Sequence, residues 1–204
     1  MWVYGAGGHA RVIVDCLESV GELVKGIIEP NDLLRDWAGY DVYKVIPLQA
    51  KNEDFIIAIG SNFLRKQVTN QLNCNYGIAH HKSAIISRDV KVHEGTVVFH
   101  RTVVQAGSVI GKHVIINTAA TVDHDCQIGD YVHISPHASL CGIVAVGEGT
   151  QIGANATVIP GIEIGKWCMI GAGSVILKDV PDYAVVVGNP GKIIKYRDKD
   201  KYTL

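Results

Sequence analysis

The sequence predicts an α/β N-terminal domain, with a small Rossmann-like βαβαβ parallel sheet, followed by an all-β left-handed parallel β-helix. Two observations predict this division. Aliphatic residues recur at every sixth position from residue 86 to residue 176, whereas residues 1–80 show no such period. Those first eighty residues instead alternate short apolar strands with segments of helical spacing around a glycine-rich turn. We expect domains at 1–80 and 81–204, the second including the C-terminal tail.

Composition excludes several classes of protein. The 204 residues are 48% hydrophobic and 19% charged, with a net charge of -1. This near-neutral balance argues against nucleic-acid binding, which needs a basic surface, and the apolar content argues against disorder. We find no signal peptide and no apolar run long enough for a membrane span. The five cysteines are widely spaced, without a CxxC pair, which predicts reduced thiols in a cytoplasmic protein.

The N-terminal domain is predicted from its alternating elements. The expected order is strand, helix, strand, strand, helix, over Trp2–Gly5, Ala10–Glu18, Leu23–Glu29, Asp54–Gly60 and Phe63–Val68. We interpret this order as a βαβαβ unit with a parallel sheet. No Gly/Ser linker precedes the second domain, so we expect the two domains to pack rigidly together.

A glycine-rich turn follows the first strand. Residues 5–10, GAGGHA, fit G-x-G-x-x-A between a strand and a helix, and Glu29 closes the next strand. This pattern favours a nucleotide phosphate held at the helix N-terminus, although a tight turn without a ligand remains the alternative. NAD is disfavoured, because only one mononucleotide-binding half fits before residue 80. A second loop, with Gly60, Asn62 and Arg65, ends the third strand, where open α/β sheets bind ligands.

The second domain is predicted from the six-residue period. A period of six keeps a strand pattern in phase, while a helix cannot hold such a stripe on one face. Each hexapeptide is therefore a short strand and a turn, with three hexapeptides to a coil, and a β-sandwich is the less favoured alternative. Glycine is frequent in the column just after the aliphatic residue, which we interpret as a glycine-tolerant corner. The aliphatic column is Ile86, Val92, Val98, Val104, Ile110, Ile116, Val122, Ile128, Ile134, Leu140, Val146, Ile152, Val158, Ile164, Ile170 and Ile176.

One corner of the β-helix carries a candidate catalytic pair. His124 stands between Asp123 and Asp125, and a carboxylate beside a histidine is what a general base needs. Gly142 lies eighteen residues on, hence one coil above, and leaves room for a substrate. The alternative is an ordinary surface histidine. A metal site formed by other histidines, His113, His133 and His137, has no supporting HxH or HxxH spacing.

The C-terminal tail is basic. Lys192 and its neighbours Lys195 and Arg197 could contact phosphate groups. We expect the residues after Arg197 to be a solvated extension.

These motifs together resemble one family along nearly the whole chain. A YGAGGHA opening, hexapeptides carrying VDHDCQIGDYVHISPHASLCG and a VGNPGKII ending are similar to bacterial sugar acyltransferases. That family includes sialic acid O-acetyltransferases and N-acetyltransferases of nucleotide-linked 4-amino-sugars. The resemblance implies a homotrimer, with acetyl-coenzyme A between neighbouring β-helices and no metal.

The resemblance also implies roles for individual residues. His124 would be the catalytic base and Asp125 its orienting acid, a position that is often Glu in the family. The acetyl-coenzyme A groove would be lined by His133, Gly142, Ala154, Gly171 and Lys192. The nucleotide-sugar would contact Gly7, Gly8, His9, Asn31, Asp32, Gly60, Asn62 and Arg65. The segment 29–32, EPND, departs from the paired acids common there, which leaves UDP, GDP and dTDP open.

The expected reaction is acetyl-coenzyme A-dependent N-acetylation of a nucleotide-linked amino-sugar of 4-amino-4,6-dideoxy type. A sugar amine would attack the thioester directly, without an acyl-enzyme, while His124 removes its proton. The nearest alternative is O-acetylation of sialic acid or another sugar hydroxyl. Two other classes are a γ-carbonic-anhydrase-like metalloenzyme and a non-catalytic sugar-nucleotide-binding scaffold.

Overall fold

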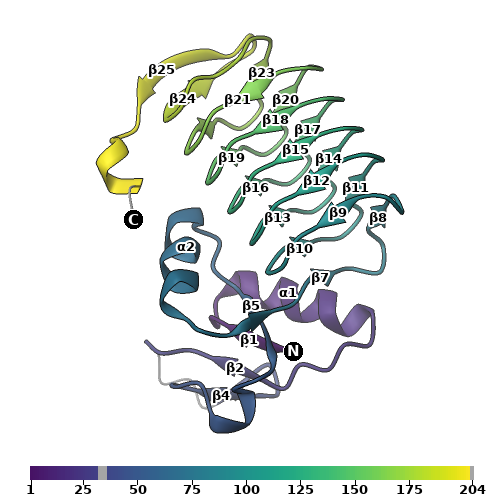
Figure 1. Cartoon of the computed structure of the whole chain (residues 1–204), viewed down its shortest axis with the longest axis vertical. Helices are drawn as coiled ribbons and strands as arrows, with labels where there is room; N and C mark the ends of the chain where they lie inside the picture. The colour runs from purple at the N-terminus through teal and green to yellow at the C-terminus, as the bar shows by residue number, and fades with distance from the viewer. Residues whose placement is uncertain (32–35, 203–204) are drawn as a thin grey trace.

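The computed structural model describes residues 1–31 and 36–202 and shows two domains stacked end to end (Figure 1). The N-terminal domain is built on a six-stranded sheet of order β3-β4-β2-β1-β5-β6. All its pairs are parallel except the β3–β4 hairpin. The strands are β1 (Trp2–Tyr4), β2 (Gly26–Ile28), β3 (Asp36–Trp37), β4 (Tyr40–Tyr43), β5 (Asp54–Ile57) and β6 (Asn75–Tyr76).

Two helices accompany this sheet, and the predicted elements occur in the predicted order, strand, helix, strand, strand, helix, with the short strands β3, β4 and β6 in addition. Helix α1 (Gly8–Ser19) links β1 to β2, but no α-helix links β2 to β5 among the residues that are described between them. That connection holds the β3–β4 hairpin and the 3₁₀ turn η1 (Leu48–Ala50), and α2 (Asn62–Gln71) follows β5. The sequence missed β4 because its alternating residues, Tyr40–Tyr43, are only partly buried and form a weak apolar pattern.

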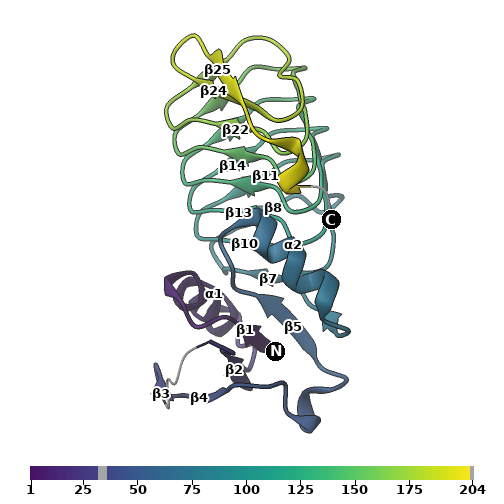
Figure 2. The same cartoon turned by 90° about the vertical axis from the view of Figure 1, so that its left-hand side faces the viewer.

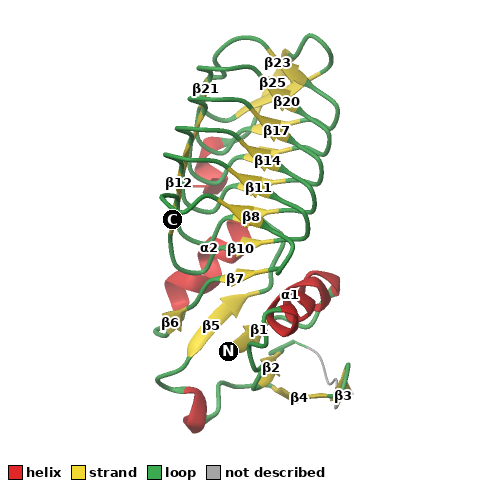
Figure 3. Ribbon diagram, turned by 90° about the vertical axis from the view of Figure 1, so that its right-hand side faces the viewer, coloured by secondary structure: helices red, strands yellow, loops and turns green. Residues whose placement is uncertain are grey.

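The second domain is a triangular β-helix in which strands pair in parallel with the strand eighteen residues later, except at the top, where β22 pairs with β24 sixteen residues on. Figure 2 shows its first face and Figure 3 its second. The first face holds β7 (Ala79–His80), β10 (Val97–Val98), β13 (Ile115–Ile116), β16 (His133–Ile134), β19 (Gln151–Ile152), β22 (Met169–Ile170) and β24 (Ala184–Val187). The second face holds β8 (Ile85–Ile86), β11 (Val103–Val104), β14 (Thr121–Val122), β17 (Ser139–Leu140), β20 (Thr157–Val158) and β23 (Val175–Ile176). The third holds β9 (Lys91–Val92), β12 (Val109–Ile110), β15 (Gln127–Ile128), β18 (Ala145–Val146) and β21 (Glu163–Ile164).

The aliphatic column forms the core of this domain, as predicted. Ile116, Val122, Ile134 and Ile152 have no solvent-exposed surface, and the other central members of the column are buried with them. Because residues eighteen apart stack directly, each coil buries its aliphatic side chains against the coils above and below. The predicted domain boundary at residue 80 falls within β7, the first strand of the β-helix.

The glycine column has a different cause from the one we predicted. Gly147 does not adopt a positive φ, but a Cβ there would lie 2.7 Å from the Gly165 carbonyl carbon of the next coil. These glycines therefore permit close stacking of coils. The left-handed backbone position falls two residues later instead, as at Gly149, and recurs every six residues with many non-glycine occupants, Asp125 among them.

Residues 198–201 are exposed, as predicted for a solvated extension, but Tyr202 is partly buried against the protein, and residues 203–204 lie outside the described residues. Strand β25 (Lys192–Tyr196) descends along the first face, and the 3₁₀ turn η2 (Lys199–Tyr202) reaches α2 (Figure 1). The Tyr202 ring stacks on Trp167 at 5.1 Å and meets Phe63 edge-on at 5.6 Å. Arg197 donates hydrogen bonds to the Trp167 carbonyl at 3.0 Å and to the Tyr202 hydroxyl. The tail thus ties the top of the β-helix to the start of α2.

Within the described residues, no helix is both long and apolar enough to cross a membrane. The five cysteines are free thiols.

Candidate active site

The glycine-rich turn leaves the N-terminus of α1 open. Gly5 adopts a φ of 106°, and a Cβ there would lie 3.1 Å from the Ala58 carbonyl oxygen, so this position requires glycine. A Cβ at Gly7 or Gly8, by contrast, would meet no atom within 4 Å. Gly7 is the N-cap of α1 and provides no side-chain hydrogen bond to the free N–H groups of the first turn. An exposed, uncapped helix N-terminus beside small residues suits a phosphate group.

His9 lies in the first turn of α1 and is held neutral. Its ring packs against Phe99 of the β-helix, with ring centroids 5.3 Å apart. Burial, and then the positive charge of Arg65, lowers the pKa of His9 to about 4. Its Nε2 atom is buried and has no hydrogen-bond partner among the described residues. A neutral imidazole with a free nitrogen therefore lies where the two domains meet.

Arg65 does not face a ligand. This side chain is 1% exposed, and all five of its N–H groups are used within the chain. Nε donates to the His113 carbonyl at 2.8 Å, and Nη2 to the Tyr131 carbonyl at 3.0 Å, both in the β-helix. The remaining bonds go to the carbonyls of Ile59 and Gly60 and to Asn62 Oδ1. The prediction that Arg65 contacts the nucleotide-sugar is therefore wrong, because no donor is left for a phosphate.

Asn62 has a similar structural role. Its side chain is buried, and Nδ2 donates to the carbonyls of Gly149 and Thr150, at 3.1 and 3.3 Å. We correct its predicted role too, since Nδ2 bonds across the domain interface and Oδ1 accepts a hydrogen bond from Arg65. Gly60 and Asn31 remain exposed beside the strand ends, while the predicted contact Asp32 lies outside the described residues.

His124 and Asp125 form the pair that the sequence predicts. They lie in the turn between β14 and β15, at the corner of the second and third faces. His124 Nδ1 is 2.9 Å from Asp125 Oδ2, and this hydrogen bond raises the pKa of His124. The left-handed φ of Asp125, 58°, is one that a short polar side chain tolerates. With Nδ1–H donating to the carboxylate, Nε2 carries the free lone pair that a general base requires.

Two glycines bracket this pair, in the coils above and below. A Cβ on Gly142 would lie 2.5 Å from His124 Nε2, which confirms the predicted stacking. A Cβ on Gly107 would lie 2.2 Å from Asp125 Oδ1. Gly107 was not predicted from the sequence, although its position eighteen residues before Asp125 could have identified it. Both absent side chains keep space around the imidazole and the carboxylate.

Gly142→Ala should therefore lower kcat about tenfold to hundredfold while changing the free energy of unfolding little. The added methyl group must displace the exposed His124 ring, and small misplacements of a catalytic group have effects of this size. Steady-state kinetics and thermal unfolding would measure both quantities. Cys141→Ala is the matched control at the neighbouring position, and its kcat should stay near the wild-type value. An unchanged kcat in Gly142→Ala would show that the ring position is not critical.

His133 lies on a different part of the prism from His124. It belongs to β16 on the first face, where its Nε2 is 3.0 Å from Asn117 Nδ2. Asn117 Oδ1 accepts the Thr118 N–H, so the amide nitrogen donates to His133, whose Nδ1 then carries the proton. Burial lowers the pKa of His133 to about 3, and the charge of Arg65 adds to this effect. His133 is thus a neutral ring on the face that carries the N-terminal domain.

The other predicted coenzyme A residues lie on separate edges. Ala154 and Gly171 follow β19 and β22, at the corner of the first and second faces, while Gly142 shares the corner of His124. Lys192, at the start of β25, lines an apolar cavity of about 390 Å³ near the top of the prism. These residues do not lie in a single groove of the described chain.

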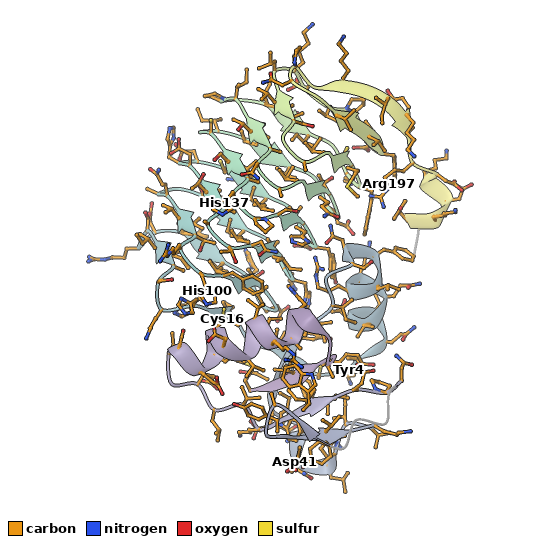
Figure 4. The ribbon with its side chains drawn as sticks, turned by 180° about the vertical axis from the view of Figure 1, so that it is seen from behind. Tyr4, Cys16, Asp41, His100, His137 and Arg197 are labelled. Atoms are coloured by element: carbon orange, nitrogen blue, oxygen red, sulfur yellow. The ribbon has the colours of Figure 1, made fainter. Side chains whose placement is uncertain are left out.

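The structure does not bring His113, His133 and His137 together as metal ligands. His113 stacks on Tyr131, with centroids 5.3 Å apart, and His137 lies exposed on the side of the prism (Figure 4). The described residues contain one other cluster, Asp15, His81 and His100, where α1 meets the β-helix. There the two imidazoles stack at 3.6 Å and 18°, so their in-plane lone pairs do not converge, and His100 Nε2 instead pairs with Asp15 at 2.7 Å. This cluster joins the domains.

Comparison with known proteins identifies both halves of the chain. Residues 1–72 match the PglD N-terminal domain, and residues 107–142 and 144–178 match the bacterial transferase hexapeptide (six repeats).

Several solved structures are similar over almost the whole chain. A variant of perosamine N-acetyltransferase from Caulobacter crescentus, in complex with CoA and GDP-perosamine, is 35% identical with a TM-score of 0.88, covering 95% of this chain and 96% of that one. The acetyltransferase domain of PglB from Neisseria gonorrhoeae is 35% identical with a TM-score of 0.87, covering 95% and 98%. WeeI from Acinetobacter baumannii is 28% identical with a TM-score of 0.86, covering 95% and 98%. With this sequence identity, coverage and fold, the chain belongs to the left-handed β-helix sugar acyltransferases.

Proposed function

We propose that the protein transfers an acetyl group from acetyl-coenzyme A to the amino group of a nucleotide-linked amino-sugar of 4-amino-4,6-dideoxy type. The observation that carries this proposal is the His124–Asp125 pair, whose Nδ1–Oδ2 hydrogen bond leaves Nε2 free under Gly142. Similarity to structures that hold CoA with GDP-perosamine, or acetyl coenzyme A, supports the donor and the class of acceptor. The open, uncapped N-terminus of α1 supports a bound phosphate.

In this mechanism the sugar amine attacks the thioester carbonyl carbon. His124 Nε2 takes the proton that the amine loses, while Asp125 stabilises the resulting imidazolium. The C–S bond then breaks, and the departing thiolate of coenzyme A takes the proton back from His124. The amide product keeps the acetyl group, and no cysteine needs to carry it.

We further propose that the active site forms between the subunits of a homotrimer. The N-terminal domain packs on the first face, where Gly60 and His133 lie, whereas His124 is at the corner of the other two faces. In a triangular prism that corner is opposite the first face. The catalytic base of one protomer would therefore deprotonate the acceptor sugar that is bound by the N-terminal domain of a neighbouring protomer. Light scattering on the purified protein should then report three chains per particle.

The charges on the prism favour one location for the coenzyme A nucleotide. The large groove on the third face, about 700 Å³, is lined by Glu163, Asp179 and Asp182 with Lys166 as its one cation among the described lining residues. That surface would repel phosphate groups. The cavity lined by Lys192 is also lined by Lys178, with Asp179 as its one acid among the described lining residues, so it suits the nucleotide end better.

The test is a side-by-side acceptor assay. Purified protein with acetyl-coenzyme A is offered UDP-, GDP- and dTDP-linked 4-amino-sugars, sialic acid and matched sugars bearing only hydroxyl groups. Thiol release and product mass should show acetylation of amines and at least a hundredfold lower turnover of hydroxyl acceptors. Preferential acetylation of sialic acid would replace the proposal with O-acetylation, and binding without turnover would favour a scaffold.

Asp125→Asn should move the acidic limb of the kcat/KM profile to lower pH. The hydrogen bond to Asp125 raises the pKa of His124, so the wild-type base becomes protonated, and inactive, at a higher pH than an unpaired histidine would. Removing the carboxylate lowers that pKa, while kcat on the plateau falls because the imidazolium loses its partner. An acidic limb that stays in place would argue that His124 is not the group titrating.

A further inference from the structure

We infer that Glu29 is a positioning residue that holds the phosphate-binding turn and the backbone at Asn31 in one fixed geometry for the nucleotide-sugar. This inference rests on the proposed binding of a nucleotide-sugar by the N-terminal domain. Glu29 follows β2, at the carboxyl end of the parallel sheet and beside the Gly5–Gly8 turn. The fold alone would place an acid here to accept a hydrogen bond from a ribose hydroxyl. The hydrogen bonds of the Glu29 carboxylate indicate a second, structural role.

Both carboxylate oxygens of Glu29 accept backbone N–H groups. Oε2 accepts from Ala6 in the glycine turn at 3.1 Å, and Oε1 accepts from Asn31 in the next loop at 3.0 Å. Hydrogen bonds to an ionised acceptor are stronger than neutral ones. One side chain thereby links two loops that the resemblance associates with the nucleotide-sugar, across 23 residues of sequence.

The Ala6 peptide is held from both sides. Its N–H is bound by Glu29, and its carbonyl accepts the indole N–H of the buried Trp37 at 2.6 Å. Gly5 donates to the Ile28 carbonyl at 2.7 Å, and the Glu29 N–H itself is bound by the Tyr43 carbonyl of β4 at 2.9 Å. These contacts restrict the backbone conformation of the turn. They therefore also fix the direction in which its open side, at Gly7 and Gly8, faces.

The direction of the Glu29 carboxylate also reduces the repulsion expected between its negative charge and a bound phosphate. A free negative charge beside a phosphate site would weaken binding. Because Glu29 directs both oxygens at N–H groups of the protein, its charge is compensated locally. A pre-organised turn then binds the diphosphate without first having to become ordered.

The test compares Glu29→Gln with wild type and with Glu53→Gln, an exposed acid of the same domain that pairs with Lys25. A glutamine keeps the size of the side chain but can accept only one of the two N–H groups, and its amide opposes the other. We expect the KM for the nucleotide-sugar to rise at least tenfold, with kcat and the KM for acetyl-coenzyme A within twofold of wild type. Glu29→Asp, which keeps the charge on a shorter side chain, should give an intermediate KM.

The outcomes separate this inference from the proposed function. If wild type acetylates the nucleotide-sugar and Glu29→Gln keeps its KM within twofold, the positioning role is overturned. A loss of folded protein alone would lower the maximal rate without raising the KM for one substrate, and would also overturn it. If wild type neither binds nor acetylates nucleotide-sugars, in calorimetry and in turnover, the proposed function fails, and this inference with it.

Discussion

Replacing His124 with alanine should lower kcat by about 10²–10⁴ while leaving the fold intact. Nε2 of this residue is the proposed proton acceptor, and the described residues place no other imidazole at the corner that Gly142 and Gly107 keep open. The side chain is 52% exposed, so its removal costs little packing. Single-turnover and steady-state assays with the preferred amino-sugar, and thermal unfolding, would measure both effects.

The matched control is His93→Ala, another exposed histidine of the β-helix. It should leave kcat and the melting temperature unchanged, since its contacts do not include the proposed site. Turnover of His124→Ala within a few fold of wild type would remove His124 as the base. The remaining function would then depend on binding and proximity alone.

The largest expected effect on stability comes from Arg65. Arg65→Ala leaves four backbone carbonyls and Asn62 Oδ1 without their donors in a buried domain interface. Unsatisfied buried polar groups are costly, so the free energy of unfolding should fall by about 3–5 kcal/mol. For a chain of this size the melting temperature should drop by on the order of 10 °C.

Arg65→Lys distinguishes the geometry of the guanidinium from its charge. A lysine keeps the charge but offers three donors from one atom, so we expect it to recover less than half of the lost stability. Arg88→Ala, at an exposed position of the β-helix, should change stability by less than about 0.5 kcal/mol. If Arg65→Ala unfolds like wild type while its KM for the nucleotide-sugar rises sharply, the guanidinium contacts the ligand after all.

Much of the β-helix could be predicted because the sequence pattern that specifies it is local and repeated. Every sixth residue enters the same core, so Val122 and Ile134 are buried for the same reason as their neighbours. The same period, with three hexapeptides to a coil, is enough to predict that Gly142 lies over His124. The glycine column was located correctly but explained wrongly, because a sequence does not show whether a glycine serves φ or close stacking.

The N-terminal domain was harder to predict in detail. Its three main strands were identified from apolar runs that are fully buried, such as Ile27 and Ile28 in β2. The short β3–β4 hairpin was missed because β3 has only two residues and the side chains of β4 are at most partly buried. The tail was expected in solvent, since nothing local in the sequence shows that Tyr202 meets Trp167, thirty-five positions earlier.

The sequence by itself determined that this protein has a six-residue solenoid, a glycine turn before a helix, and an acid next to a histidine. Those features depend on neighbours or on a fixed spacing, which a linear pattern records. Only the tertiary structure decided what Arg65, Asn62 and Glu29 do. A guanidinium binds a phosphate or five protein acceptors according to what surrounds it, and here docking of the N-terminal domain brings the carbonyls of His113 and Tyr131 within reach.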